Sequence, residues 1–219
     1  MFSGSHDLSN RDVRRDWSAS TVKTKHFDVK DQPVEAMQNP WELSQMIELY
    51  CDRRPRRVLE LGTCLGGVLY HFLKNAIPVA IVGGVDDLSN GGGIVGLDQL
   101  EIASDMLDDW ESWTPKGVDF QFFNGKTSDP KIVSDVKAKF GSIDFLFIDA
   151  GHSYEECLFD FETYGSMVAI GGIICLHDIA QADLGPHRLW REIREAGYVT
   201  KQLIADPNAT EAGIGVVYI

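Results

Sequence analysis

Four acidic and histidine side chains that could carry out chemistry stand at the ends of two apolar runs. Asp149 lies at the end of the first run, and His152 follows it three residues later. His177 and Asp178 lie at the end of the second run. Two carboxylates and water suit Mg²⁺, whereas an imidazole favours Mn²⁺, Fe²⁺ or Zn²⁺. The imidazole of His152 could also accept a proton near neutral pH. The four residues predict a site in which Asp149, His177 and Asp178 bind a metal beside His152. The alternative is that each one merely ends a strand and caps a helix.

A glycine-rich turn, ELGTCLGG at 60–67, comes earlier in the sequence and follows another apolar run. Glycine permits a tight turn and lets a ligand approach the backbone. The spacing is not G-x-G-x-x-G and no phosphate-binding lysine follows, so neither a dinucleotide site nor a P-loop is predicted. Glu60, which precedes the turn, suits a cationic or amino-bearing ligand. The alternative interpretation is a turn that binds nothing.

An acidic residue, Asp86, ends the apolar run that comes after this turn. In α/β proteins that bind nucleosides, a carboxylate at such a position accepts hydrogen bonds from the ribose hydroxyls. Asp87 is an alternative for the same role, and an acid that only begins the loop is another. Together with the glycine turn, Asp86 predicts a ribose-binding site.

Strands and helices alternate along most of the chain and provide the framework for these residues. Runs typical of strands lie at 57–62, 79–86, 118–125, 143–150, 171–179, 201–206 and 213–219. Helical patterns occupy 39–52, 63–76, 97–113, 129–141, 154–168 and 187–197. This alternation predicts a doubly wound α/β fold with one mostly parallel, seven-stranded sheet. No helix separates the last two runs, so they predict a hairpin whose final strand is antiparallel. Ligands are expected at the carboxyl ends of the parallel strands.

The first predicted helix carries start signals. Asn39 can cap it, Pro40 suits its first turn, and Glu42 is expected to complete a capping box. We expect residues 1–38 to form an arm or lid and residues 39–219 to form one domain.

Two further features bear on substrate selection. The glycine-rich loop at 87–97 is expected to lie over the strand ends together with the arm, as a mobile lid or as a plain connection. Trp17, Phe27, Trp110 and Trp113 could line a pocket there, although aromatic residues more often pack in a core.

Composition excludes several classes of function. The net charge of −13 opposes binding to phosphate backbones, so no nucleic-acid partner is expected. No apolar stretch has the length of a membrane span, and the N-terminus lacks the apolar core of a secretory signal. The 4 cysteines show no CxxC pairing and are too few for a disulfide framework. These features predict a cytoplasmic protein without a membrane partner.

The sequence resembles the class I methyltransferases, which use S-adenosylmethionine. The resemblance rests on ELGTCLGG, GVDD, FIDAGHSYEE and GGIICLHDI, and runs from about residue 37 to the C-terminus. Within that superfamily the sequence is similar to the metal-dependent sugar O-methyltransferases and the cephalosporin-hydroxylase-like proteins, and more distantly to catechol O-methyltransferase. The resemblance implies a Rossmann-like methyltransferase domain, a small-molecule substrate and association into a homo-oligomer.

The resemblance also implies a role for each motif residue. The residues expected to bind S-adenosylmethionine are Glu60, Gly62, Thr63, Gly66, Gly67, Asp86, Thr127 and Asp149. The implied ligands of Mg²⁺ or Mn²⁺ are Asp149, His177 and Asp178, although better-studied members carry a carboxylate where this chain has His177. His152 corresponds to the general base, which would deprotonate a substrate hydroxyl before its oxygen accepts the methyl group.

Three other functions are compatible with parts of this pattern. An N-methyltransferase would share the fold and need no metal. A non-catalytic protein could retain the S-adenosylmethionine pocket without turnover. An NAD-dependent oxidoreductase is disfavoured by the missing G-x-G-x-x-G spacing and by the closing hairpin.

Overall fold

The computed structural model describes residue 29 and residues 32–87, 99–208 and 210–219 of the chain. Residues 1–28 and 30–31 of the expected arm, with Trp17 and Phe27, lie outside this part, as does the glycine-rich loop after residue 87. The role of both segments in substrate selection therefore stays a prediction. The division into an arm and one domain likewise stays a prediction. No helix in the described part is long and apolar enough to cross a membrane.

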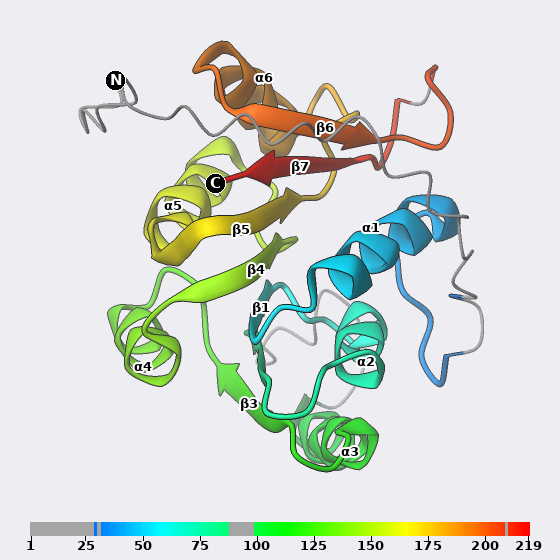
Figure 1. Cartoon of the computed structure of the whole chain (residues 1–219), viewed down its shortest axis with the longest axis vertical. Helices are drawn as coiled ribbons and strands as arrows, with labels where there is room; N and C mark the ends of the chain where they lie inside the picture. Colours follow the sequence, from blue (N-terminus) through cyan, green and yellow to red (C-terminus); the bar gives the residue numbers. More distant parts are fainter. Residues whose placement is uncertain (1–28, 30–31, 88–98, 209) are drawn as a thin grey trace.

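One sheet, with seven strands in the described part of the chain, forms the centre of the fold (Figure 1). Its strands are β1 (Arg57–Leu61), β2 (Ile81–Asp86), β3 (Asp119–Asn124), β4 (Ile143–Ile148), β5 (Val168–Leu176), β6 (Val199–Leu203) and β7 (Ile214–Tyr218). They lie in the order β3-β2-β1-β4-β5-β7-β6. β7 is antiparallel to both β5 and β6, and the other neighbouring pairs are parallel. The doubly wound α/β fold and its closing hairpin are therefore confirmed.

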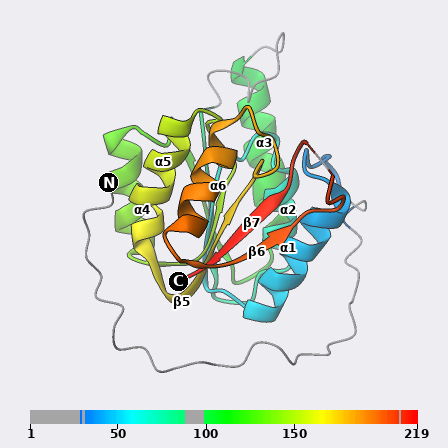
Figure 2. The same cartoon turned by 90° about the horizontal axis from the view of Figure 1, so that it is seen from above.

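The helices of the described part of the chain cover both faces of the sheet, as the view from above shows (Figure 2). They are α1 (Pro40–Arg53), α2 (Gly67–Lys74), α3 (Gln99–Trp113), α4 (Pro130–Phe140), α5 (Tyr154–Thr163) and α6 (Gly185–Glu195). α1, α2 and α3 cover one face, and α4, α5 and α6 cover the other. Each face has its own apolar cluster, because the side chains of a strand alternate between the two sides. The central strands are therefore mostly apolar on both faces, and Glu60 of β1 is a buried exception.

Trp110 belongs to the core on the α1–α3 face. It is fully buried in α3, and its ring packs edge-on against Phe122 of β3, with centroids 4.8 Å apart. Trp113 is partly buried against the same cluster. Both tryptophans therefore contribute to packing between α3 and its neighbours.

The start of α1 agrees with its sequence signals in part. Asn39 caps the helix, since its side chain accepts a hydrogen bond from the Trp41 backbone at 2.9 Å. The predicted capping box was wrong. Glu42 is only 1% exposed and turns away from the cap, because its two oxygens accept hydrogen bonds from the backbone N–H groups of Ala205 and Gly213, both at 2.9 Å. The Glu42 carboxylate therefore binds the β6–β7 connection in place of the predicted capping-box contact at the start of α1.

We expect the change Glu42→Ala to lower the free energy of unfolding by about 2–4 kcal/mol. The substitution removes the acceptor of the buried Gly213 N–H and of the partly buried Ala205 contact. An unpaired buried group costs about 1–3 kcal/mol, and the loss of the second bond adds to it. Denaturant unfolding measures the loss, and Glu48→Ala on the same helix is a control because Glu48 is only partly buried. Equal stability of both variants would contradict the role assigned to Glu42.

The boundary between α5 and β5 differs from the prediction. The helix ends at Thr163, a 3₁₀ turn follows at Gly165–Met167, and β5 begins at Val168. Its pairing with β4 shifts register between Ile143 and Phe145, opposite the Gly171–Gly172 pair. The glycines weakened the strand pattern in the sequence, although the chain already runs along the sheet there.

Candidate active site

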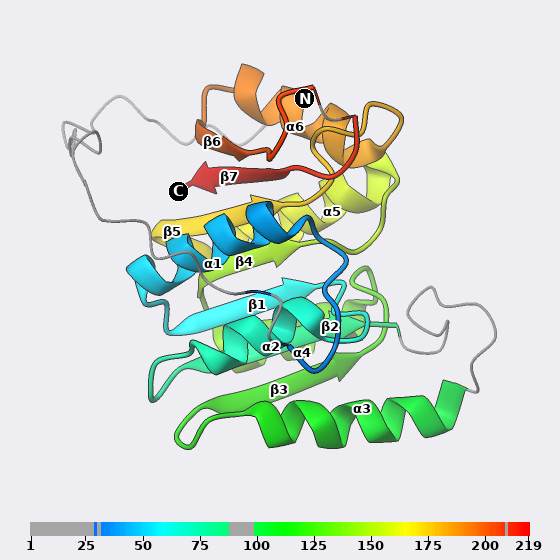
Figure 3. The same ribbon diagram turned by 90° about the vertical axis from the view of Figure 1, so that its right-hand side faces the viewer.

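The predicted site residues lie at one edge of the sheet, where the parallel strands end (Figure 3). The glycine turn follows β1, Asp86 ends β2, Asp149 follows β4, and His177 and Asp178 follow β5. β1 lies between β2 and β4, so the connections leave it in opposite directions. This reversal of strand order is where open α/β sheets bind ligands.

The glycine turn after β1 packs too closely for larger side chains. Gly62 has a φ of +88°, and a Cβ atom on it would overlap the carbonyl oxygen of Asp149. Gly66 has a φ of +86°, and a Cβ there would overlap Nε1 of Trp110. The turn thus brings bare backbone to the switch point, as a ligand that binds along the backbone requires.

Two acids flank this turn. Glu60 is 1% exposed, and its Oε2 has no hydrogen-bond partner among the described residues. Burial, followed by the charges of Asp149 and Asp86, raises the pKa of Glu60 well above its usual value. Asp86 accepts a hydrogen bond from the Cys64 backbone at 2.6 Å, and burial is the main cause of its raised pKa. The unpaired buried oxygen of Glu60 fits a ligand that supplies a hydrogen-bond donor.

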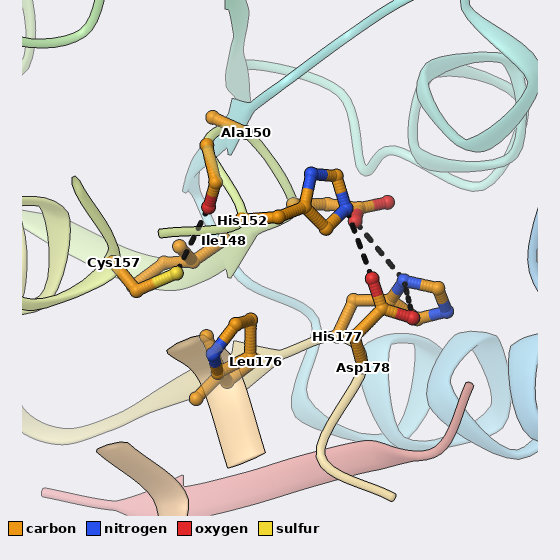
Figure 4. Close-up of a pocket in the computed structure, with 10 residues that line it drawn as sticks. Ile148, Ala150, His152, Cys157, Leu176, His177 and Asp178 are labelled. Carbon is orange, nitrogen blue, oxygen red and sulfur yellow. Dashed lines mark hydrogen bonds and ion pairs between the residues drawn. The ribbon is translucent and has the colours of Figure 1, made fainter. Parts of the chain in front are cut away.

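A second cluster forms a continuous chain of polar contacts (Figure 4). Nδ1 of His177 lies 3.0 Å from Oδ1 of Asp149 and 3.2 Å from Oδ1 of Asp178. The other oxygen of Asp178 lies 3.0 Å from Nε2 of His152. His177 is buried, whereas the His152 side chain is 52% exposed. The chain therefore runs from buried acids to an imidazole that a substrate can reach.

Charge pairing sets the protonation of this cluster. Burial by itself lowers the pKa of His177, but the carboxylates of Asp149 and Asp178 outweigh it and raise the pKa to about 10. Burial raises the pKa of Asp178, yet the hydrogen bonds from His152 and His177 hold it well below its usual value. The hydrogen bond with Asp178 is the main cause of the raised pKa of His152. At neutral pH His177 is an imidazolium between two carboxylates.

This pairing predicts a pH dependence of stability. Folding raises the pKa of His177 from 6.5 to about 10, so its contribution is complete below pH 6.5 and is lost as the pH rises through about 10. We expect the wild-type protein to lose a few kcal/mol more than His177→Gln over this interval. Urea unfolding at a series of pH values measures the difference. Parallel curves for the two proteins would show that His177 does not hold its proton between the acids.

The donor set fits a divalent cation. One ligand atom from each of Asp149, His152 and Asp178 can be chosen so that all lie within 4.8 Å of one another. In this arrangement Nδ1 of His177, one of the predicted ligands, faces both carboxylates, and its Nε2 is buried without a partner among the described residues. The metal set predicted from sequence therefore stays a prediction, with His152 as a competing third ligand.

Contacts from α5 and α6 position the loop that carries His152. The backbone N–H of Gly185, the first residue of α6, donates to the carbonyl of His152 at 2.9 Å. The thiol of Cys157 on α5 donates to the carbonyl of Gly151 at 2.9 Å. A small cavity beside the loop is lined by Gly151, His152 and Cys157 together with Leu176 and Pro186. The loop is thus fixed at both of its flanks.

Gln38 is a site residue that the sequence motifs did not indicate. It ends a segment, residues 32–38, that we call the strap, which runs from α2 to the start of α1 on the side of the strand ends (Figure 3). Nε2 of Gln38 donates to Oδ2 of Asp149 at 2.5 Å. The only signal in the sequence was its position directly before a predicted helix cap.

The strap is held at its other end by His71 of α2. With the Gln32 amide oriented to satisfy its neighbours, its nitrogen donates to Val29 at 3.0 Å and to Nε2 of His71 at 2.6 Å, and its oxygen accepts from Ala36 at 3.0 Å. Burial is the main cause of the low pKa of His71, about 4, so the ring is neutral and can accept this bond. The strap therefore lies in a defined position across α2.

Thr127 is the one predicted cofactor residue that lies in the β3–α4 connection. Its carbonyl accepts a hydrogen bond from the Tyr164 hydroxyl at 2.7 Å, which ties the connection to the end of α5. Its proposed place near an adenine stays a prediction.

Known proteins resemble this chain in fold. An O-methyltransferase from Bacillus cereus in complex with S-adenosylhomocysteine matches with a TM-score of 0.60 and 14% identity, over 87% of this chain and 86% of that one. The O-methyltransferase TomG from Streptomyces achromogenes, in complex with S-adenosylmethionine, matches with a TM-score of 0.59 and 14% identity, over 85% and 82%. A putative caffeoyl-CoA O-methyltransferase from Staphylococcus aureus matches at 0.55 and 16%, over 86% and 87%.

Sequence comparison gives the family. A search of curated protein sequences finds no match. The family model described as a methyltransferase domain matches residues 59–179, more than half of the chain. This interval contains the glycine turn, Asp86 and the whole Asp149–Asp178 cluster. The chain therefore belongs to the methyltransferase-domain family and has the class I methyltransferase fold.

Proposed function

We propose that this protein transfers a methyl group from S-adenosylmethionine to a hydroxyl group of a small molecule. The observation that carries the proposal is the pairing of His152 with Asp178 at the strand ends, beside a glycine turn with unpaired acceptors. The family match and the O-methyltransferases of similar fold, two of them in complex with S-adenosylmethionine or S-adenosylhomocysteine, support it.

The turn after β1 would hold the cofactor, whose sulfonium supplies an already activated methyl group. Gly62, Gly66 and Gly67 leave the backbone accessible to its methionine part. Glu60 and Thr63 offer buried oxygens that have no partner among the described residues. The residues further along the edge would complete the site, with Asp86 accepting hydrogen bonds from the ribose and Thr127 lying near the adenine.

His152 would act as the general base. Its exposed imidazole is oriented by a carboxylate of Asp178, an arrangement in which the acid stabilises the proton that the imidazole receives. Only the neutral imidazole accepts a proton, and the contact with Asp178 raises its pKa. Turnover is therefore expected to increase with pH through a midpoint above 6.5, the ordinary value for histidine.

We also propose that Mg²⁺ or Mn²⁺ binds between Asp149 and Asp178. When bound, such an ion acidifies a hydroxyl group and so assists its deprotonation. Two candidates exist for an imidazole ligand. His177 would have to release the proton that now faces both acids, and His152 could not serve as ligand and base at once. With His152 as the base, His177 is therefore the imidazole ligand that the proposal requires.

An acceptor panel tests the proposed reaction. The protein is incubated with methyl-labelled S-adenosylmethionine and with catechols, sugars and other polyols, amines serving as the comparison set. We expect S-adenosylhomocysteine and a methyl ether in equal amounts, with Mg²⁺ or Mn²⁺ increasing the rate and EDTA removing the increase. Methylated amines as the sole products, formed equally well in EDTA, would instead identify an N-methyltransferase.

A further inference from the structure

The nitrogen of the Gln38 amide has a hydrogen-bond partner among the described residues, whereas its oxygen has none. Its nitrogen donates to Asp149, and because a carboxylate only accepts hydrogen bonds, the amide oxygen must be the remaining atom. Gln38 is 7% exposed, and its Oε1 is buried without a partner in the described part of the chain. Such unpaired atoms are rare in folded proteins and indicate a missing donor.

The surroundings of this oxygen indicate which donor is missing. The amide is planar, so Oε1 lies beside the Asp149 carboxylate that its nitrogen contacts. The backbone N–H of Asp149 donates to the carbonyl of Leu61 at 2.8 Å, and Leu61 follows Glu60, whose Oε2 is a second buried oxygen without a partner among the described residues. A group placed here meets several acceptors and negative charge. An ammonium group, with three N–H donors and a positive charge, has the matching chemistry.

The strap places this acceptor on the cofactor side of the site. Ala36, two residues before Gln38, packs on Gly67 so closely that a Cβ atom on Gly67 would lie 2.6 Å from its Cα. Gly67 is the last residue of the glycine turn and the first of α2. Gln38 therefore lies next to the backbone along which the methionine part of the cofactor is proposed to bind.

We propose that Gln38 is a cofactor-binding residue whose Oε1 accepts a hydrogen bond from the ammonium group of S-adenosylmethionine, while its Nε2 holds Asp149. This inference rests on the proposed cofactor. It adds a contact from outside residues 59–179, the part matched by the family model. A second hydroxyl of the substrate offers the same donor chemistry, so the experiment must separate the two ligands.

Calorimetric titration with two ligands tests this contact. S-adenosylhomocysteine carries the ammonium group, whereas 5′-methylthioadenosine lacks the amino-acid part altogether. We expect Gln38→Met to weaken S-adenosylhomocysteine binding about 10- to 100-fold, the range for a hydrogen bond to a charged group. Binding of 5′-methylthioadenosine should change less than about twofold. Gln45→Met on α1 is the control, because Gln45 is a partly buried glutamine whose amide contacts Glu48 of the same helix, and it should match the wild type for both ligands.

Each other outcome has a definite meaning. Unchanged S-adenosylhomocysteine binding by Gln38→Met would overturn the proposal and leave a substrate hydroxyl as the donor. If Gln38→Met binds neither ligand, the variant Gln38→Glu decides, because glutamate restores an acceptor at this position. Recovery of S-adenosylhomocysteine binding by Gln38→Glu supports the contact. No recovery would mean that Gln38 has a purely structural role. A wild-type protein that binds neither ligand would contradict the proposed function rather than this inference.

Discussion

Replacing Gly62 by alanine is expected to abolish cofactor binding and to destabilise the fold. The new Cβ would overlap the carbonyl oxygen of Asp149, a backbone atom that cannot move aside without displacing the end of β4. The positive φ of Gly62 adds strain. We expect the free energy of unfolding to fall by about 3 kcal/mol or more. Binding of S-adenosylhomocysteine, measured by calorimetry, should weaken at least about 100-fold.

Gly117 provides a matched control for this substitution. Its φ is +90°, close to the +88° of Gly62, but no atom lies within 4 Å of the place that a Cβ would occupy. Gly117→Ala therefore introduces the backbone strain without the overlap, and should cost about 1–2 kcal/mol while leaving ligand binding unchanged. If the two variants behaved alike, close packing of the turn against Asp149 would not be the reason for the glycine.

The second large effect is expected at His152. His152→Ala should lower kcat about 10²- to 10⁴-fold, the usual contribution of a positioned general base. The affinity for S-adenosylhomocysteine should stay unchanged, because His152 is exposed and belongs to the substrate side of the cluster. Turnover is measured with the acceptor found in the panel. Undiminished turnover by a folded His152→Ala protein would remove the base from the mechanism.

Asp178→Asn separates the orientation of this base from its presence. The hydrogen bond with Asp178 is the main cause of the raised pKa of His152, so its loss should move the titration of the His152 imidazole to lower pH. Imidazole chemical shifts, recorded against pH without added metal, report this directly and need no substrate. An unchanged midpoint would mean that Asp178 does not set the protonation of His152.

The sequence alone predicted the sheet and the edge at which the site lies. Alternation of apolar strands with helices leaves few topologies, and parallel strands bring their carboxyl ends together. Residues as distant as Asp86, Asp149 and Asp178 could therefore be assigned to one edge of the sheet. The missing helix between β6 and β7 was sufficient to predict the antiparallel strand.

Contacts that depend on tertiary structure were beyond the sequence pattern. Glu42 matched a local capping rule, but its burial beneath the β6–β7 connection gave its carboxylate two other donors. Gln38 belongs to no periodic element, so only the folded strap shows that its amide reaches Asp149. The position of His177 between two acids likewise follows from the exact spacing of β4 and β5, which no pattern of residue types specifies.

The most direct test of the central claim is calorimetric titration of the protein with S-adenosylhomocysteine, carried out in EDTA and again with Mg²⁺ or Mn²⁺. We predict micromolar binding at one site per chain, with a change on adding metal if Asp149 and Asp178 hold an ion near the cofactor. Absence of binding under every metal condition would contradict the assignment of this site to S-adenosylmethionine-dependent methyl transfer.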